Sequence, residues 1–185
     1  MKAIINTSYL VGDINIPGTD KAYVADVIDK MILKHQNRFM EKVLGYALYW
    51  PIKEAIEDSE KETDPVPLPI EISNLMNGME TREYTHVGIK NLYAFWIYHR
   101  YMGKSQTETT TTGESSAKKT NAARASSIYK MVDAWNEMCD QSVFVRNYLK
   151  DPYFVGIAEP APIEWRPCCS WKDWPLFEKE NILNI

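Results

Sequence analysis

The spacing of apolar residues predicts a mainly helical chain. Behind a capping residue at Thr19 or Asp20, apolar side chains recur every three or four positions, the pattern of one face of an amphipathic helix. The pattern continues to Gly45, a residue type that often follows the C-terminus of a helix. The apolar positions are Val24, Val27, Ile28, Met31, Ile32, Phe39, Met40, Val43 and Leu44.

The next predicted helices differ in how much of their surface is apolar. A short helix carries its apolar residues from Leu48 to Ile56, with Pro51 tolerated near its start. Alternating prolines at 65–70 then predict an extended connector. The stretch from Ile89 to Met102 is apolar around most of its circumference, which is typical of a helix buried centrally or between subunits.

The strongest helical pattern runs over about residues 123–150, with Ser126 or Ser127 as the capping residue and Asp151-Pro152 as its end. We therefore expect a small helical bundle around this one long central helix. A short β-hairpin or extended segments complete the predicted fold: Ile4-Ile5 with Tyr9–Val11, and a strand at 83–87.

Residues 103–122 form the clearest break in composition, because they are polar and contain no large apolar residue. Such a segment buries too little surface to offset the entropy of ordering it, so we expect a flexible polar loop or one that a partner orders. The tail is rich in Pro and Trp, which predicts an extended arm with short turns. The predicted division is a helical domain over 1–152 and a C-terminal arm over 153–185.

Composition places the chain among ordinary globular proteins and argues against a strongly basic nucleic-acid binder. Its 185 residues carry 21 Lys and Arg against 25 Asp and Glu, a formal net charge of −4. Proteins that bind DNA through its phosphates usually carry a basic excess. Three cysteines, an odd count, argue against a disulfide framework and fit a reducing cytoplasm. No leader peptide and no apolar run near the roughly 20 residues of a membrane helix is visible, so we expect no membrane partner.

No residue pattern points to catalysis, a metal or a cofactor, and we expect none. The histidines and cysteines lack the spacing of a metal site, and no glycine-rich phosphate loop or nucleophile elbow occurs. Glu54, Glu57, Asp58 and Glu60 offer an acid–base pair in principle, but their spacing favours the solvated face of a surface helix. An enzyme such as a small hydrolase is a rival hypothesis, which a deep cleft with perturbed acids would support.

Two groups of residues are candidates for binding a partner. Lys118, Lys119 and Arg124 give the polar loop a basic end that contacts DNA phosphates or an acidic partner, although simple solubility of an exposed loop is the favoured interpretation. In the tail, a Trp-rich arm either anchors in a neighbour's groove or folds back over its own core, and neither is favoured. The tryptophans concerned are Trp165, Trp171 and Trp174.

Five blocks of sequence occur in the order of a known family. They are Leu44–Tyr49 (Leu-Gly-Tyr-Ala-Leu-Tyr), Arg82–Thr85 (Arg-Glu-Tyr-Thr), the aromatic stretch Tyr93–Tyr101, Thr111–Gly113 followed by Asn121–Arg124, and Ala134–Met138 (Ala-Trp-Asn-Glu-Met). Over about residues 20–150, this order resembles small head–tail connector (adaptor, or head-completion) proteins of tailed bacteriophages and prophages of gut Bacteroidetes. The proline stretch 64–70 and the longer, Trp-rich tail depart from the family pattern.

The resemblance implies a structural virion protein without catalytic residues. It implies a ring, most often of twelve copies, that joins the capsid portal to the tail and forms part of the conduit for DNA. The partners would be other copies of the chain, the portal protein, a downstream tail or ring protein, and passing double-stranded DNA without sequence-specific binding. The location would be the head–tail interface of a virion assembled in the host cytoplasm. Expected contacts with the portal or a neighbour are the loop residues Thr110, Thr111, Thr112, Gly113, Lys118, Lys119 and Arg124 and the three tail tryptophans.

The alternative is a DNA-binding or packaging accessory protein of a phage. Its candidate residues are again Lys118, Lys119 and Arg124, and its affinity for duplex DNA would fall steeply with salt. The acidic overall charge favours the connector, because a weakly repulsive surface keeps a passing duplex from sticking.

Overall fold

A computed structural model describes residues 2–80, 85–105, 107–110, 113–116 and 121–158. Over this part of the chain the protein is mainly helical, as predicted, with six α-helices and two short antiparallel hairpins. Two 3-10 turns, η1 (Thr7–Tyr9) and η2 (Gly12–Ile14), precede the first helix.

Helices α1 (Ala22–Leu44) and α2 (Tyr46–Ser59) meet at a single glycine. Gly45 has φ of 70°, and its N–H donates to the Glu41 carbonyl at 2.9 Å, so the predicted glycine at the end of α1 is confirmed. The predicted cap at Thr19 or Asp20 is wrong, because α1 starts at Ala22. Lys21 therefore occupies the N-cap position, and its side chain makes no capping hydrogen bond.

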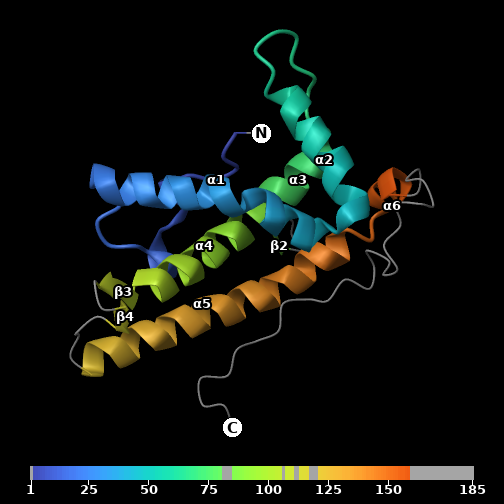
Figure 1. Cartoon of the computed structure of the whole chain (residues 1–185). Helices are drawn as coiled ribbons and strands as arrows, with labels where there is room; N and C mark the ends of the chain where they lie inside the picture. The colour runs from blue at the N-terminus through green and yellow to red at the C-terminus, as the bar shows by residue number, and fades with distance from the viewer. Residues whose placement is uncertain (1, 81–84, 106, 111–112, 117–120, 159–185) are drawn as a thin grey trace.

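Helix α4 (Ile89–Ser105), not the longest helix, occupies the centre of the bundle. It lies between α1 and α5 (Asn121–Tyr148), as Figure 1 shows. Seven of its ten residues from 89 to 98 are buried: Ile89, Leu92, Tyr93, Ala94, Trp96, Ile97 and Tyr98. The expectation of a long central helix is therefore corrected: α5 is long but packs with one face only, leaving Tyr129, Val143 and Phe144 exposed. Since α5 begins at Asn121, the predicted cap at Ser126 or Ser127 is also wrong.

A short helix and a hairpin link α2 to α4. Helix α3 (Ile70–Asn77) leads directly into strand β1 (Gly78–Glu80), which pairs antiparallel with β2 (Thr85–Val87), with Gly78 opposite Val87. The predicted strand at 83–87 is thus confirmed for its described part, 85–87. Residues 65–69 have no regular secondary structure, in line with the predicted connector.

The N-terminal segment packs into the core instead of forming strands. Its apolar side chains Ile4, Ile5, Leu10, Ile14 and Ile16 are all buried. Gln36 of α1, itself buried, holds the segment, because its Oε1 accepts from the Ile4 N–H at 3.2 Å and its Nε2 donates to the Lys2 carbonyl at 3.1 Å. The predicted strand pair Ile4-Ile5 with Tyr9–Val11 is wrong, since a side-chain amide satisfies the backbone that a second strand would have paired.

The described part of the polar stretch 103–122 contains regular structure that the sequence pattern did not predict. Residues 103–105 end α4, and strands β3 (Thr107–Thr110) and β4 (Gly113–Ser116) pair antiparallel. Thr107 lies opposite Ser116, and Thr110 lies opposite Gly113. Ladder hydrogen bonds and the β-propensity of threonine order a segment that has no apolar side chain to bury.

The chain after α5 turns into a further helix, α6 (Pro152–Ala158). Asp151 caps it, accepting from the Tyr153 N–H at 2.9 Å, and Pro152 takes the first helical position. Phe154 is fully buried, with its ring 5.5 Å from that of Tyr148. The expectation that residues 153–185 are extended is therefore wrong for 153–158, and the rest of that arm lies outside the described residues.

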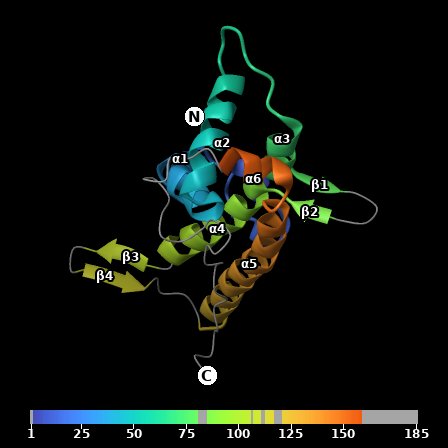
Figure 2. The same ribbon diagram turned by 90° about the vertical axis from the view of Figure 1, so that its right-hand side faces the viewer.

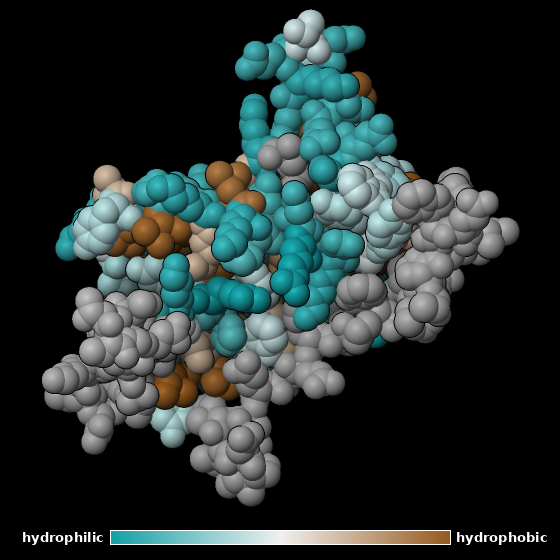
Figure 3. Space-filling model, viewed as in Figure 1, coloured by the Kyte–Doolittle hydropathy of each residue, from teal (hydrophilic) through white to brown (hydrophobic). Residues whose placement is uncertain are grey.

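Two elements project from the helical body. The β3–β4 hairpin extends from one end of the bundle, clear of α4 and α5 (Figure 2), and the distal end of α2 with the loop after it rises from another side (Figure 1). Hydrophilic residues cover most of this second projection (Figure 3). The protein thus has two projections of different structure, a β-hairpin and the end of a helix with its following loop.

Candidate functional site

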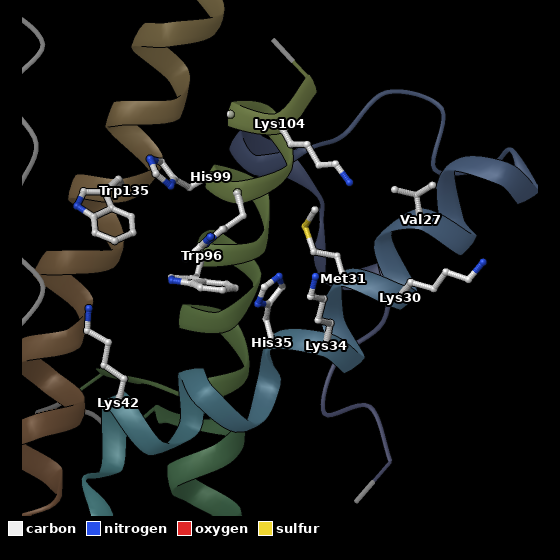
Figure 4. A pocket seen from close by; sticks show the side chains of 12 residues that line it. Val27, Lys30, Met31, Lys34, His35, Lys42, Trp96, His99, Lys104 and Trp135 are labelled. Atoms are coloured by element: carbon white, nitrogen blue, oxygen red, sulfur yellow. The ribbon is translucent and has the colours of Figure 1, made fainter. Parts of the chain in front are cut away.

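A groove of about 840 Å³ lies where α1, α4 and α5 come together (Figure 4). Its volume is within the range of ordinary ligand sites, about 300–1,000 Å³. Helix α1 lines it with Val27, Lys30, Met31, Lys34, His35 and Lys42. Helix α4 contributes Trp96, His99, Arg100, Gly103 and Lys104, and α5 contributes Trp135.

The charge of this groove has one sign. Lys30 and Lys34 lie one turn apart on α1, Arg100 and Lys104 lie one turn apart on α4, and Lys42 stands at the other end. Among the lining residues, all of which belong to the described chain, none is Asp or Glu. We call these five cations and the rings between them the basic groove. Opposite helices bring their cations to one hollow, which favours an anionic ligand.

Lys30 forms an ion pair with Asp26 at the rim of the groove, and this pair screens the charge of Lys30 only weakly. Asp26 contacts the Lys30 ammonium at 2.6 Å, but both side chains are more than half exposed to water, at 58% and 75%. Exposed pairs of this kind contribute about 0–1 kcal/mol, because water and salt screen them. Lys30 therefore remains able to contact a second carboxylate or phosphate.

Trp96 forms the floor of the groove and is 7% exposed. The guanidinium carbon of Arg100 lies 4.6 Å from the centre of its ring, and the His35 ring packs edge-on at 5.4 Å. From the core side, Tyr93 and Phe39 pack against it at 5.8 and 5.7 Å. Because its faces are already covered, Trp96 holds the Arg100 guanidinium in place and leaves no surface for a nucleobase to stack on.

His35 stays neutral near pH 7 because of where it lies. Burial lowers its pKa, and the nearby positive charges of Arg100, Lys34 and Arg38 lower it further. The folded protein then binds the His35 proton more weakly than the unfolded chain, whose pKa is about 6.5. The stability that depends on neutral His35 is present above that value and is lost as pH falls through the lowered, folded-state pKa.

Replacing Arg100 by glutamine is expected to raise the pKa of His35 toward its ordinary value, because one repelling charge is removed. An NMR titration of the imidazole carbon protons would measure the shift, with Lys150→Gln, an exposed charge two residues after the end of α5, as the matched control. An unchanged His35 pKa in the Arg100 variant would show that the groove's cations do not act together.

A second hollow, of about 690 Å³, lies against Phe95 and Tyr98 of α4. Its charged lining residues are of both signs, with Asp13, Asp133 and Glu137 beside Lys130. Charges that cancel within one site favour no particular ligand, so the basic groove is the stronger candidate.

The structure describes only some of the residues expected to bind a partner. Thr110 and Gly113 form the last pair of the β3–β4 ladder, and Arg124 lies in the first turn of α5. The others lie outside the described residues: Thr111, Thr112, Lys118, Lys119, Trp165, Trp171 and Trp174. The groove shares only Gly103 and Lys104 with the polar segment 103–122, and its other lining residues were not predicted as a site. Their only sequence signal is the pairs of cations four residues apart, at 30 and 34 and at 100 and 104.

Within the described chain, no three His, Cys, Asp or Glu side chains gather as metal ligands. No helix in that part combines the length and the apolar character needed to cross a membrane. In comparisons with known proteins, no family model, no curated protein and no solved structure matched the chain.

Proposed function

We propose that the chain is a non-catalytic structural subunit of a head–tail connector (adaptor) ring of a tailed bacteriophage. The ring joins the capsid portal to the tail at the portal vertex of the virion. Its partners are further copies of the chain, the portal protein and a downstream tail or ring protein, with double-stranded DNA passing through the conduit. The proposal rests first on the ordered sequence blocks that resemble such connectors.

The observation that carries the proposal is that described residues of three of the blocks lie in one hydrophobic core. Leu44 and Leu48 of the first block, Tyr93 of the aromatic block and Met138 of the last are all buried. The aromatic block and the last block meet directly, where the rings of His99 and Trp135 lie 4.6 Å apart. Residues that resemble a family and also form the core support a shared fold more strongly than scattered surface matches would.

The two projections suit a closed ring. In a ring with cyclic symmetry, one surface of each subunit contacts a different surface of the next. The β3–β4 hairpin, which includes Thr110 and Gly113, and the acidic end of α2 extend from different sides of the body (Figures 1 and 2). Such elements can reach a neighbour or the portal without disturbing the core.

Mixing the purified chain with the portal protein encoded in the same genome is expected to give complexes of ring-like mass in mass photometry. Replacing residues 107–116 by a Gly/Ser segment of equal length should remove these complexes, because the hairpin is an expected contact, and should leave the helical circular dichroism unchanged. A wild-type chain that stays monomeric and ignores the portal at micromolar concentration would contradict the proposal.

A DNA-binding or packaging accessory protein is the second candidate, and the basic groove favours it. Five cations in one hollow can contact several phosphates. Duplex DNA bound in this way would be released steeply as salt rises, and Lys34→Glu would reduce the affinity. No retention on a DNA column in low salt would remove this candidate.

A further inference from the structure

The end of α2 and the loop after it carry a dense negative charge. Residues 54–64 contain six carboxylates and one lysine, Lys61, for a net charge of −5. We call this segment the acidic spur. The carboxylates are Glu54, Glu57, Asp58, Glu60, Glu62 and Asp64.

The spur is presented to solvent and is fixed in direction. Every residue from 61 to 67 is exposed, and the projection stands away from the other helices (Figures 1 and 3). Its base is anchored, because Ile52 and Ile56 of α2 are buried in the core. The chain that returns from the loop is tied to α2 by the Val66 N–H, which donates to the Asp58 carbonyl at 3.3 Å. A segment tied in this way loses less entropy on binding than an untied one would.

Local contacts neutralise only part of the spur. Lys61 pairs with Asp58 at 2.6 Å, Lys53 reaches Glu57 at 3.9 Å, and the Lys2 backbone N–H donates to Glu60 at 3.0 Å. Glu57, Asp58 and Glu60 take part in these contacts, in which the side chains of Glu57 and Asp58 are 40% and 36% exposed, so the charge of half of the carboxylates is reduced in part. Glu54 and Glu62 are exposed and face solvent next to them.

The spur and the basic groove carry opposite charges, and each also has an exposed valine beside it. The groove offers five cations without an acid among its described lining residues, and the spur offers six carboxylates with one lysine. Val66 beside the spur is 55% exposed, and Val27 at the groove is 42% exposed, so each surface also carries an apolar contact. The spur cannot reach its own groove, because α2 is packed in place and points away from it (Figure 1).

We propose that the basic groove binds the acidic spur of a second copy of this chain. Spur and groove are different surfaces of one subunit, so the contact is head-to-tail and can be repeated around a ring. The covered faces of Trp96 favour carboxylates over the stacked bases of a nucleic-acid strand. The inference deepens the proposed connector function, since a ring needs such a contact, but it is tested on the chain alone.

Sedimentation velocity in low salt tests the contact with two charge-reversed variants. The groove variant is Lys30→Glu with Lys34→Glu, which are exposed lysines on α1; Arg100 is kept because it covers Trp96. The spur variant is Glu54→Lys with Glu62→Lys, both exposed. The wild-type chain is expected to self-associate and to dissociate as salt rises, and each variant should weaken association at least tenfold.

Mixing the two variants provides the decisive test, because the unchanged spur of the groove variant can then bind the unchanged groove of the spur variant, which restores one wild-type contact. Pairs that contain one copy of each variant should form with near wild-type affinity, although neither variant associates with itself. Lys21→Glu with Lys150→Glu gives the same change in net charge as the groove variant at exposed positions outside the groove lining and the spur, and it should leave association unchanged. Circular dichroism and thermal melting confirm that each variant is folded.

The inference would be overturned by a wild-type chain that stays monomeric in low salt, by an equal effect of the control variant, or by no rescue on mixing. Loss of DNA binding in the groove variant with self-association intact would likewise overturn it and would favour the accessory-protein candidate. Portal binding is scored separately by mass photometry. If the chain binds the portal but mixing the variants gives no rescue, only the spur–groove contact is disproved. If mixing gives rescue but the chain does not bind the portal, only the connector function is disproved.

Discussion

Replacing Tyr93 by alanine is expected to lower the free energy of unfolding by about 3–5 kcal/mol, the usual cost of removing a buried aromatic ring. Tyr93 of α4 is 0% exposed, and its ring packs 4.8 Å from that of Phe39 on α1. Its hydroxyl donates to the Ile32 carbonyl at 2.6 Å, which ties the central helix to α1 a second time. The deletion leaves a cavity between two helices whose other packing cannot close it. Urea unfolding followed by circular dichroism gives the value.

A milder substitution separates the ring of Tyr93 from its hydroxyl. Tyr93→Phe keeps the packing and loses one buried hydrogen bond, so the expected cost is about 1 kcal/mol. Tyr129→Ala on α5, a residue 49% exposed, is the control and should change stability by no more than about 0.5 kcal/mol. If Tyr93→Ala cost no more than Tyr93→Phe, the placement of α4 as the central helix would be wrong.

Replacing Gly88 by alanine is expected to destabilise the protein by about 1–3 kcal/mol, the usual cost of overfilling a packed site. Gly88 joins β2 to α4 and is buried, and its carbonyl accepts from the Asn91 N–H at 3.1 Å. A methyl group there would overlap the backbone nitrogen of Gly78 and the carbonyl oxygen of Met76. Because both obstacles are backbone atoms, relief requires α3 and the β1–β2 hairpin to shift away from α4. Thermal unfolding measured alongside chemical unfolding would detect the loss.

The same substitution at Gly156 is the matched control. A methyl group there meets nothing within 4 Å, and Gly156 lies inside helix α6. Alanine is a better helix former than glycine by up to about 1 kcal/mol, so Gly156→Ala should be neutral or slightly stabilising. Equal effects at both glycines would contradict the close approach of the chain at Gly88.

The helices could be predicted from the sequence because their apolar residues repeat at the helical period. Observed helices correspond to the apolar positions that start at Val24, at Leu48 and at Ile89. The glycine at position 45 lies, as predicted, at the end of the first of them. Helix starts were less predictable, since α1 and α5 begin without the capping side chains that the sequence suggested. Which helix is central depends on burial around the whole circumference, and that property of α4 outweighs the greater length of α5.

The features that were missed depend on contacts between distant parts of the chain. Lys34 and Arg100 are far apart in sequence, and only the packing of α1 on α4 brings them to one groove. The β3–β4 hairpin was missed because its order comes from backbone pairing, whereas the sequence argument weighed buried apolar surface. Gln36, which replaces an expected strand partner for the N-terminal segment, gives no signal in a local pattern.

Cryo-electron microscopy of intact virions is the most direct test of the central claim that the chain is a connector subunit. The account expects a ring of density between portal and tail into which the α1–α5 bundle fits, with the β3–β4 hairpin at a portal or subunit contact. Particles whose head–tail junction is fully accounted for by other proteins, with this chain absent from them by mass spectrometry, would contradict it.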